Sequence, residues 1–234
     1  MNRLATESPN GRALATVSPR GAALAVLSDP HSPSAEAYRS LAANLQFAYA
    51  DRQVQTIGIT SAAEGEGKST TVANLAVALA QTGRRVIAID ADLRRPGLHT
   101  MFGVSRDQGL TDVLRGQEAE LPLQETGTAG VRLLASGPVA ANPLEALASR
   151  RFDQALALAR AQADFVLVDT PPAGALADVA VIAPRLEGML LVVSAGHTKR
   201  DLARRAREQL ERVNANLLGV VLTDVRVDAK MYRY

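Results

Sequence analysis

The chain has 234 residues, of which 47% are hydrophobic and 21% charged, and its formal net charge is +2. This composition predicts a globular protein of one main domain, and no stretch reaches the roughly 18 consecutive apolar residues of a membrane span. The absence of cysteine excludes disulfides, thiolate metal sites and cysteine redox chemistry, and the first residues lack the apolar core of a signal peptide, so we expect a cytoplasmic protein.

The chain is expected to begin with an arm and a first helix. Residues 1–33 are rich in Ser, Pro, Ala and Gly without sustained periodicity, which predicts a flexible N-terminal arm. Apolar residues at near-helical spacing then predict a helix over residues 34–50, with Ser34 as its N-cap. We expect the folded domain to span residues 34–225 and a mobile tail to follow over residues 226–234.

Short apolar runs alternate with amphipathic stretches along the rest of the chain. The apolar runs predict strands at residues 54–60, 84–90, 164–172, 188–196 and 216–225. Helical spacing predicts helices near residues 72–82 and 198–213, the latter capped by Thr198. It also predicts a helix or helix pair over residues 142–163, capped by Asn142. Between residues 93 and 140 only LTDVLRG, a short helix, and VRLLASG, a strand, give a signal. This alternation predicts an α/β fold, a doubly wound and mostly parallel sheet with helices on both faces.

The segment SAAEGEGKST lies between a predicted strand and a predicted helix, which is the context that a phosphate-binding loop requires. Gly65 and Gly67 permit backbone conformations and a close approach that side chains would block. Lys68 can reach the β- and γ-phosphates, and Ser69 can offer its hydroxyl to Mg²⁺. The consensus asks for glycine where this chain has Ala62, the next smallest residue.

Three aspartates follow predicted strands. Asp90 and Asp92 lie at the end of the second strand, and Asp169 ends the strand FVLVD. The carboxyl ends of parallel strands converge on the ligand crevice, where carboxylates can hold Mg²⁺ through its waters. Any one of them could instead be a turn or cap residue, but together with the loop they predict a nucleotide and metal site.

Several segments resemble one known family. They are EAYRSLAANLQFA, ITSAAEGEGKSTTVANLAVALAQTGRRVIAIDADLRRPGLH, GLTDVLRG, NPLEAL and FVLVDTPP, and they resemble the bacterial tyrosine kinases, the autophosphorylating cytoplasmic enzymes of capsule and exopolysaccharide export. The resemblance runs over most of the chain and implies a P-loop NTPase fold of the MinD/ParA type, with ATP and Mg²⁺ in the site. The signature lysine of MinD/ParA proteins would fall at Ala63, so that feature is missing.

The resemblance implies a role for each residue of the phosphate loop. Gly65, Glu66 and Gly67 would help to bind ATP, Lys68 would hold the γ-phosphate, and Thr70 would contact the α-phosphate.

The resemblance also implies how the metal and the tyrosine are held. Ser69, Asp90, Asp92 and Asp169 would bind Mg²⁺. One of Asp90 and Asp92 would also orient or deprotonate the incoming tyrosine, because a neutral phenol with a pKa of about 10 needs an acceptor for its proton. Lys68, Asp90 and Asp92 would thus be the catalytic residues.

Two arginines follow the second acidic motif. Arg94 and Arg95 could stabilise charge on the transferring phosphoryl group, although arginines after a strand more often form surface ion pairs.

The end of the chain offers two phosphate acceptors. The final segment DAKMYRY contains Tyr232 and Tyr234, where the family typically carries several tyrosines. The 11 residues after Thr223 extend at most about 37 Å, enough to enter the site of a neighbouring subunit. The alternative is that these tyrosines cover an apolar patch or have no role.

Two further positions depart from the family pattern. The ring-forming helix of the family carries Glu-x-x-Arg-x-x-Arg, and this chain has Glu36 and Arg39 but Ala42 at the last position. The pattern therefore predicts a weaker ring contact or a different one. Near the expected adenine pocket, Thr223 stands where other members carry asparagine, which leaves base selectivity open.

The resemblance implies partners as well. The family members without a membrane span rely on a separate membrane activator protein, so we expect such a partner at the inner face of the plasma membrane, a homo-oligomer, and no nucleic acid. Two other functions remain open. One is an ATP-dependent switch or scaffold of a polysaccharide or exosortase-linked system that does not use tyrosine as an acceptor. The other is a DNA-partitioning protein, which would need a coherent basic surface and the missing loop lysine.

Overall fold

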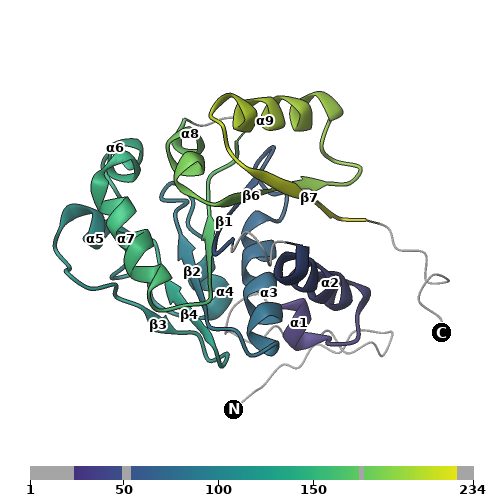
Figure 1. Cartoon of the computed structure of the whole chain (residues 1–234), viewed down its shortest axis with the longest axis horizontal. Coiled ribbons are helices and arrows are strands. Elements are labelled where there is room, and N and C mark those ends of the chain that lie inside the picture. The colour runs from purple at the N-terminus through teal and green to yellow at the C-terminus, as the bar shows by residue number, and fades with distance from the viewer. Residues whose placement is uncertain (1–23, 49–53, 174–176, 226–234) are drawn as a thin grey trace, which may run out of the picture.

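The computed structural model describes residues 24–48, 54–173 and 177–225 (Figure 1). Within them, seven strands form one sheet in the order β3-β4-β2-β5-β1-β6-β7. The strands are β1 (Thr56–Ser61), β2 (Val86–Asp90), β3 (Gln124–Glu125), β4 (Val131–Leu134), β5 (Phe165–Asp169), β6 (Gly188–Ser194) and β7 (Leu217–Thr223). All neighbouring pairs are parallel except β3 with β4. The predicted mostly parallel sheet is confirmed.

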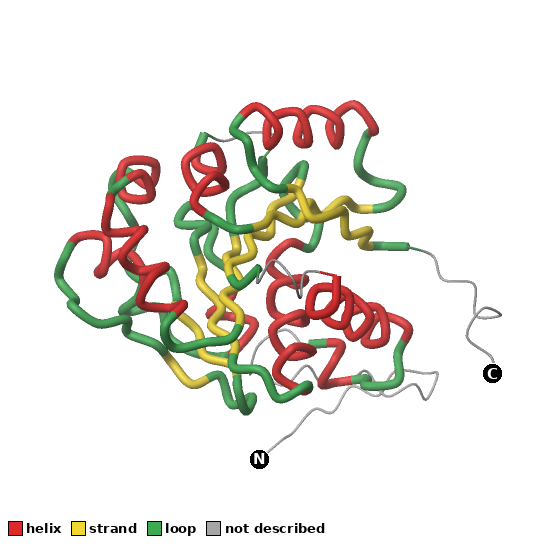
Figure 2. Tube along the Cα trace, viewed as in Figure 1, coloured by secondary structure: helices red, strands yellow, loops and turns green. Residues whose placement is uncertain are grey.

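Helices cover both faces of this sheet (Figure 2). They are α1 (Ala25–Ser28), α2 (Pro33–Ala48), α3 (Lys68–Gln81), α4 (Leu98–Phe102), α5 (Leu110–Arg115), α6 (Pro143–Ala148), α7 (Arg150–Arg160), α8 (Asp178–Ile182) and α9 (Arg200–Arg212), with a 3₁₀ turn η2 (Ala183–Arg185). One apolar core lies between the sheet and α1 to α4, and a second lies between the opposite face and α5 to α9. The fold is therefore doubly wound, as predicted.

The strand order decides where a ligand can bind. Strands β1 and β5 are neighbours, yet the chain leaves β1 towards β2 on one side and leaves β5 towards β6 on the other. The segments that follow β1 and β5 therefore run in opposite directions and leave a crevice at the carboxyl ends of both strands. A crevice of this kind is the usual ligand site of an open α/β sheet. The segment after β1 and the residue that ends β5, Asp169, both lie at this crevice.

The predicted flexible N-terminal arm over residues 1–33 extends too far along the chain. Residues 24–33, which were assigned to it, contain α1, and Val26 is fully buried against α3. The Val26 amide donates to Asn74 Oδ1 at 3.1 Å. A four-residue helix has no sequence period long enough to recognise, so the composition of this segment concealed its fold. The rest of the expected arm and the tail over residues 226–234 lie outside the described residues.

Two of the three predicted N-caps are wrong. Helix α2 begins at Pro33, and the hydroxyl of Ser32, not of Ser34, accepts the amide of Ala35 at 3.2 Å. Helix α9 begins at Arg200 without a side-chain cap, because the Thr198 hydroxyl is used elsewhere.

The third predicted cap and the two weak signals of the middle region are confirmed. Asn142 Oδ1 accepts the amide of Glu145 at 3.3 Å at the start of α6. LTDVLRG forms α5 and VRLL forms β4. The two-residue strand β3 and the five-residue helices α4 and α8 were not predicted, because each is too short to show a periodicity.

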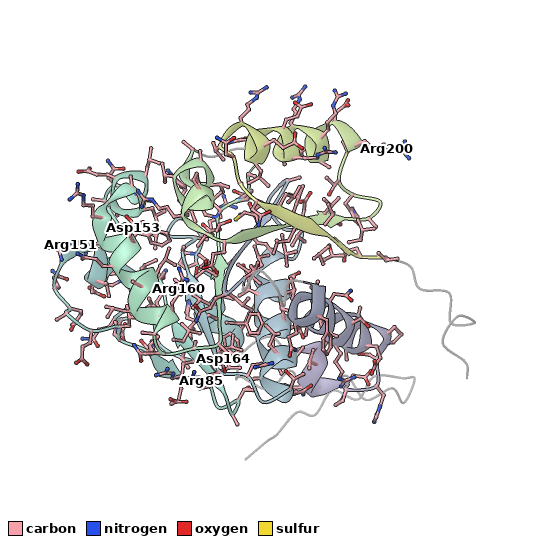
Figure 3. All side chains as sticks on the ribbon, viewed as in Figure 1. Arg85, Arg151, Asp153, Arg160, Asp164 and Arg200 are labelled. Atoms are coloured by element: carbon pink, nitrogen blue, oxygen red, sulfur yellow. The ribbon has the colours of Figure 1, made fainter. Side chains whose placement is uncertain are left out.

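The charged helices expose acids and bases together. On α9, Arg204 pairs with Glu208 and Arg207 with Glu211, each one turn apart. Figure 3 shows Arg200 at the start of α9, and Arg151 and Asp153 on α7. Within the described part of the chain, no helix has the length and apolarity needed to cross a bilayer.

Candidate functional site

The loop between β1 and α3 has the shape of an anion cradle. Gly65 and Gly67 have φ values of +77° and +87°, in the left-handed region that favours glycine. Gly67 is the N-cap of α3, and a Cβ there would lie 3.3 Å from Thr223 Cγ2. Helix α3 has 14 residues, and its first amides have no partner within the helix, so they are available to a bound anion. Both glycines thus adopt backbone conformations that other residues disfavour, as the sequence predicted; their contact with ATP stays a prediction.

Lys68 lies among the predicted carboxylates. Its Nζ is 2.7 Å from Asp92 Oδ2 and 3.4 Å from Asp169 Oδ1. The same Nζ is 3.2 Å from the hydroxyl oxygen of Ser69. The side chain of Lys68 is 12% exposed and that of Asp169 is fully buried. Residues about 100 positions apart in the sequence are thus brought together at the ends of β1, β2 and β5.

Asp90 lies behind this group and is fully buried. Its Oδ2 accepts the amides of Gly97 and Leu98, both at 3.0 Å, and so fixes the segment that follows β2. Asp90 pairs in register with Asp169 on the neighbouring strand, which places two carboxylates side by side. Asp92 differs, since its Oδ1 accepts the amide of Arg95 at 3.0 Å while its Oδ2 faces Lys68.

Burial opposes the ionisation of two of these acids. Burial raises the pKa of Asp169 to about 6, against the lowering effect of Lys68. Burial, followed by repulsion from Asp169, also raises the pKa of Asp90 well above its usual value. For Lys68, burial acts to lower the pKa, but attraction to Asp169 and Asp92 outweighs it and the pKa is raised. The ammonium ion of Lys68 therefore stabilises a site that otherwise holds too much negative charge.

Two carboxylate oxygens of the site lack a partner among the described residues. Asp90 Oδ1 and Asp169 Oδ2 are buried and accept no hydrogen bond from that part of the chain. A buried oxygen of this kind costs free energy unless a ligand or water satisfies it. The described residues form no cluster of three or more His, Cys, Asp or Glu side chains that could hold a metal alone. The donor set instead fits Mg²⁺, which keeps several waters and is usually bound by one or two protein oxygens together with phosphates.

The two arginines after Asp92 are engaged in ion pairs. Arg94 binds the carboxylate of Asp178 with two hydrogen bonds of 2.5 and 3.1 Å, and Asp178 is fully buried at the start of α8. Arg95 pairs with Glu64 of the phosphate loop. Asp178 was missed because nothing in its local sequence distinguishes it from an ordinary acid in the first turn of a helix.

The remaining loop residues fall into two groups. Glu66 is buried, and its carboxylate accepts the amide of Ala63 at 3.0 Å, so only its backbone is available to a phosphate. Thr70 is exposed on the first turns of α3. Thr223 donates its hydroxyl hydrogen to the carbonyl oxygen of Glu66 at 2.8 Å, so that proton is not available to an adenine ring.

The site opens into a cavity of about 310 Å³. Its walls include Glu64, Gly65, Lys68, Asp92, Arg94 and Arg95. A larger cavity of about 600 Å³ lies at the amino ends of the strands, where Arg85 and Asp164 form an ion pair (Figure 3). The phosphate loop does not line that cavity, so we assign the chemistry to the smaller one.

Two other predicted regions are the terminal tyrosines and the charged positions of α2. Tyr232 and Tyr234 fall outside the described residues. On α2, Glu36 pairs with Arg39 three residues on, whereas Ala42 is fully buried in the core shared with α3. At position 42 the chain therefore has a packing residue and not a third surface charge.

Known proteins share this architecture and sequence. The ParA family, described as "NUBPL iron-transfer P-loop NTPase", matches residues 53–224. This chain has no cysteine, the usual ligand of iron–sulfur clusters. The tyrosine-protein kinase YwqD of Bacillus subtilis is 41% identical over 197 residues, which are 84% of this chain and 83% of that protein.

A longer relative and a solved structure are also similar to this chain. The putative tyrosine-protein kinase EpsB of Ralstonia solanacearum is 39% identical over 206 residues, or 88% of this chain, yet these cover only 27% of that protein. The kinase domain of the Escherichia coli tyrosine kinase ETK matches with a TM-score of 0.85 and 32% identity, over 92% of this chain and 85% of that one.

Proposed function

The chain belongs to the bacterial tyrosine-protein kinases, which share the ParA-type P-loop domain, and we propose that it transfers the γ-phosphate of ATP to its own tyrosines, Tyr232 and Tyr234. We further propose that transfer occurs in trans between subunits of a homo-oligomer. The kinase would act in the cytoplasm in capsule or exopolysaccharide synthesis and export, held at the inner face of the plasma membrane by a separate activator protein.

One observation carries the proposal. Lys68 lies between Asp92 and Asp169 at the mouth of the phosphate loop, and two buried oxygens, on Asp90 and Asp169, lack partners. The loop and the lysine are sufficient to bind a nucleoside triphosphate. The carboxylates at the ends of two further strands add groups that can accept a hydrogen bond from an acceptor hydroxyl. Phosphoryl transfer requires mainly this positioning and charge neutralisation.

The reaction assigns a task to each side chain. In it, a tyrosine oxygen forms a bond to the γ-phosphorus, the bond from that phosphorus to the bridging oxygen breaks, and ADP leaves. Lys68 neutralises charge on the β- and γ-phosphates, and the amides of the loop bind the phosphate oxygens. The tyrosine proton passes to a carboxylate, and Asp92 is the better placed acceptor because it lines the cavity whereas Asp90 is fully buried.

Ser69, Asp90, Asp92 and Asp169 are the residues that would hold Mg²⁺, directly or through water. When bound, the ion would neutralise phosphate charge. Asp169 would hold the ion only in its ionised form, and a nearby cation favours that form. Asp90 fixes the backbone that carries Gly97 and Leu98 and so keeps the segment after β2 in place.

Phosphotyrosine formation tests the proposal. The purified protein is incubated with γ-labelled ATP and Mg²⁺, with and without a candidate activator's cytoplasmic tail, and phosphotyrosine is measured. We expect weak labelling alone and stronger labelling with the tail. Labelling should disappear in the double variant Tyr232→Phe/Tyr234→Phe and in Lys68→Met, while Tyr38→Phe, on helix α2, should label normally.

The outcomes separate the two functions that share this site. ATP consumption without phosphotyrosine under both conditions would identify a switch or scaffold ATPase and overturn the kinase proposal. Strong labelling of the isolated chain would keep the kinase and remove the need for an activator. Labelling that survives the double tyrosine substitution would place the acceptors elsewhere.

A further inference from the structure

A set of side-chain contacts holds the phosphate loop from the side of β6 and β7. Glu66 stands between Gly65 and Gly67 and is 5% exposed. One carboxylate oxygen of Glu66 accepts the amide of Ala63 at 3.0 Å, and the other accepts the hydroxyl of Thr198. The carboxylate therefore links the first part of the loop to the segment that follows β6.

The contacts continue through the ends of two strands. The oxygen of the Thr198 hydroxyl also accepts the amide of Ser194, the last residue of β6, at 3.0 Å. The Ser194 hydroxyl donates to Asp224 at 2.6 Å, directly after β7. The Thr223 hydroxyl closes the network by donating to the carbonyl oxygen of Glu66 at 2.8 Å.

The loop needs such a support because its own backbone does not fix its curvature. Glycine populates left-handed and right-handed conformations almost equally, and Gly65 and Gly67 flank Glu66 with positive φ angles. The amides between them can face one anion only if the segment is held in a single conformation. Glu66 provides the only side chain between these two glycines, and it is anchored to the protein and not to the cavity.

We propose that Glu66 and Thr198 are positioning residues that preorganise the phosphate loop for nucleotide binding. Glu66 does not contact the nucleotide through its carboxylate. The hydroxyl of Thr198 satisfies this buried carboxylate and holds the loop in the conformation that binds phosphate. The proposal deepens the nucleotide-binding part of the proposed function and does not depend on tyrosine as the acceptor.

Thr198→Val is the sharpest test, because valine keeps the shape and removes the hydroxyl. The Kd for ATP and for ADP, measured by calorimetry with Mg²⁺, should rise about tenfold, as expected for a lost hydrogen bond to a charged group. Thr198→Ser keeps the hydroxyl and should bind nucleotide almost as the unchanged protein does. Normal nucleotide affinity in Thr198→Ser together with weakened affinity in Thr198→Val would show that the hydroxyl of residue 198 supports nucleotide binding.

A matched control separates positioning from general stability. Thr111 is also buried and donates its hydroxyl to the carbonyl oxygen of Pro138 at 2.9 Å, far along the chain from the loop. Thr111→Val should lower the melting temperature and leave the Kd for ATP unchanged. If Thr198→Val does not fold, Thr223→Val should give the same rise in Kd. An unchanged Kd in the folded valine variant, or an equal rise in Thr111→Val, would overturn the proposal and leave the phosphotyrosine assay unaffected.

Discussion

At the scale of single residues, the site combines burial with an excess of negative charge. Asp90 and Asp169 are fully buried on adjacent strands, and Lys68 is the basic side chain in contact with Asp92 and Asp169. Neighbouring carboxylates destabilise the folded protein unless a cation or a proton compensates. The free protein therefore carries at this site a free-energy cost that ligand binding can relieve.

This free-energy cost leads us to predict that Asp169→Asn stabilises the folded protein. Burial disfavours the charged form of Asp169 and raises its pKa to about 6 in the folded protein. In the unfolded chain the pKa lies near the ordinary value of 3.8. The folded state then binds more protons between these values, so the contribution of Asp169 to stability is present below pH 4 and is lost as pH rises to 6. In the absence of nucleotide, Asp169→Asn should be more stable than the unchanged protein at pH 7.5, by about 1 to 3 kcal/mol.

Urea unfolding at pH 4.5 and pH 7.5 checks the prediction. The gain from Asp169→Asn should shrink at the lower pH, where the native carboxyl is protonated. Asp164 provides the control, since hydrogen bonds from Arg85 lower its pKa and Asp164→Asn should lose stability at pH 7.5. A destabilised Asp169→Asn protein at both pH values would contradict this account.

The residues of the site were largely predictable, and their partners were not. Asp90, Asp92 and Asp169 could be found because they end or closely follow buried strands, whose carboxyl ends must meet in a parallel sheet. The partners of Arg94 and Glu66 come from α8 and from the loop after β6. No period or motif marks Asp178, and the sequence indicated Thr198 only as a helix cap. Such contacts depend on how separate elements pack, which a local pattern does not encode.

At the scale of elements, the long ones follow from their sequence and the short ones do not. Helix α3 shows its apolar stripe over 14 residues, and the six predicted strands are all present. Helix α1 has four residues in a segment whose composition is typical of a linker. Its order comes from tertiary contacts, since Val26 packs in the core and its amide bonds to Asn74 of α3. Tertiary packing thus overrides a weak local preference.

Helix α1 can be tested by a pair of neighbouring substitutions. Val26→Ala removes fully buried methyl groups and should lower the free energy of unfolding by about 1 to 3 kcal/mol. Leu27→Ala removes a larger side chain that is 49% exposed and should change it by less than about 1 kcal/mol. Urea denaturation measures both. Equal effects, or no effect of Val26→Ala, would mean that residues 24–28 do not belong to the folded domain.

At the scale of the whole molecule, the sheet places the phosphate loop and the start of the tail together. Strands β1, β6 and β7 are parallel, so their carboxyl ends lie at one edge, and Thr223 at the end of β7 contacts Glu66 of the loop. The described part of the chain therefore ends, two residues after Thr223, close to the phosphate loop. The 11 residues after Thr223 extend at most about 37 Å, a length that permits transfer within one subunit or between two.

A mixing experiment distinguishes these two routes. One chain carries Lys68→Met and keeps both tyrosines, and the other carries Tyr232→Phe/Tyr234→Phe and keeps the lysine. Each chain alone should form almost no phosphotyrosine. If transfer occurs in trans, the mixture with ATP, Mg²⁺ and the activator's tail should label the Lys68→Met chain, with a rate per chain that rises with total protein concentration as subunits associate. A size tag on one chain identifies which is labelled. An unlabelled mixture, under conditions in which the unchanged protein is labelled, would show that each subunit phosphorylates its own tail.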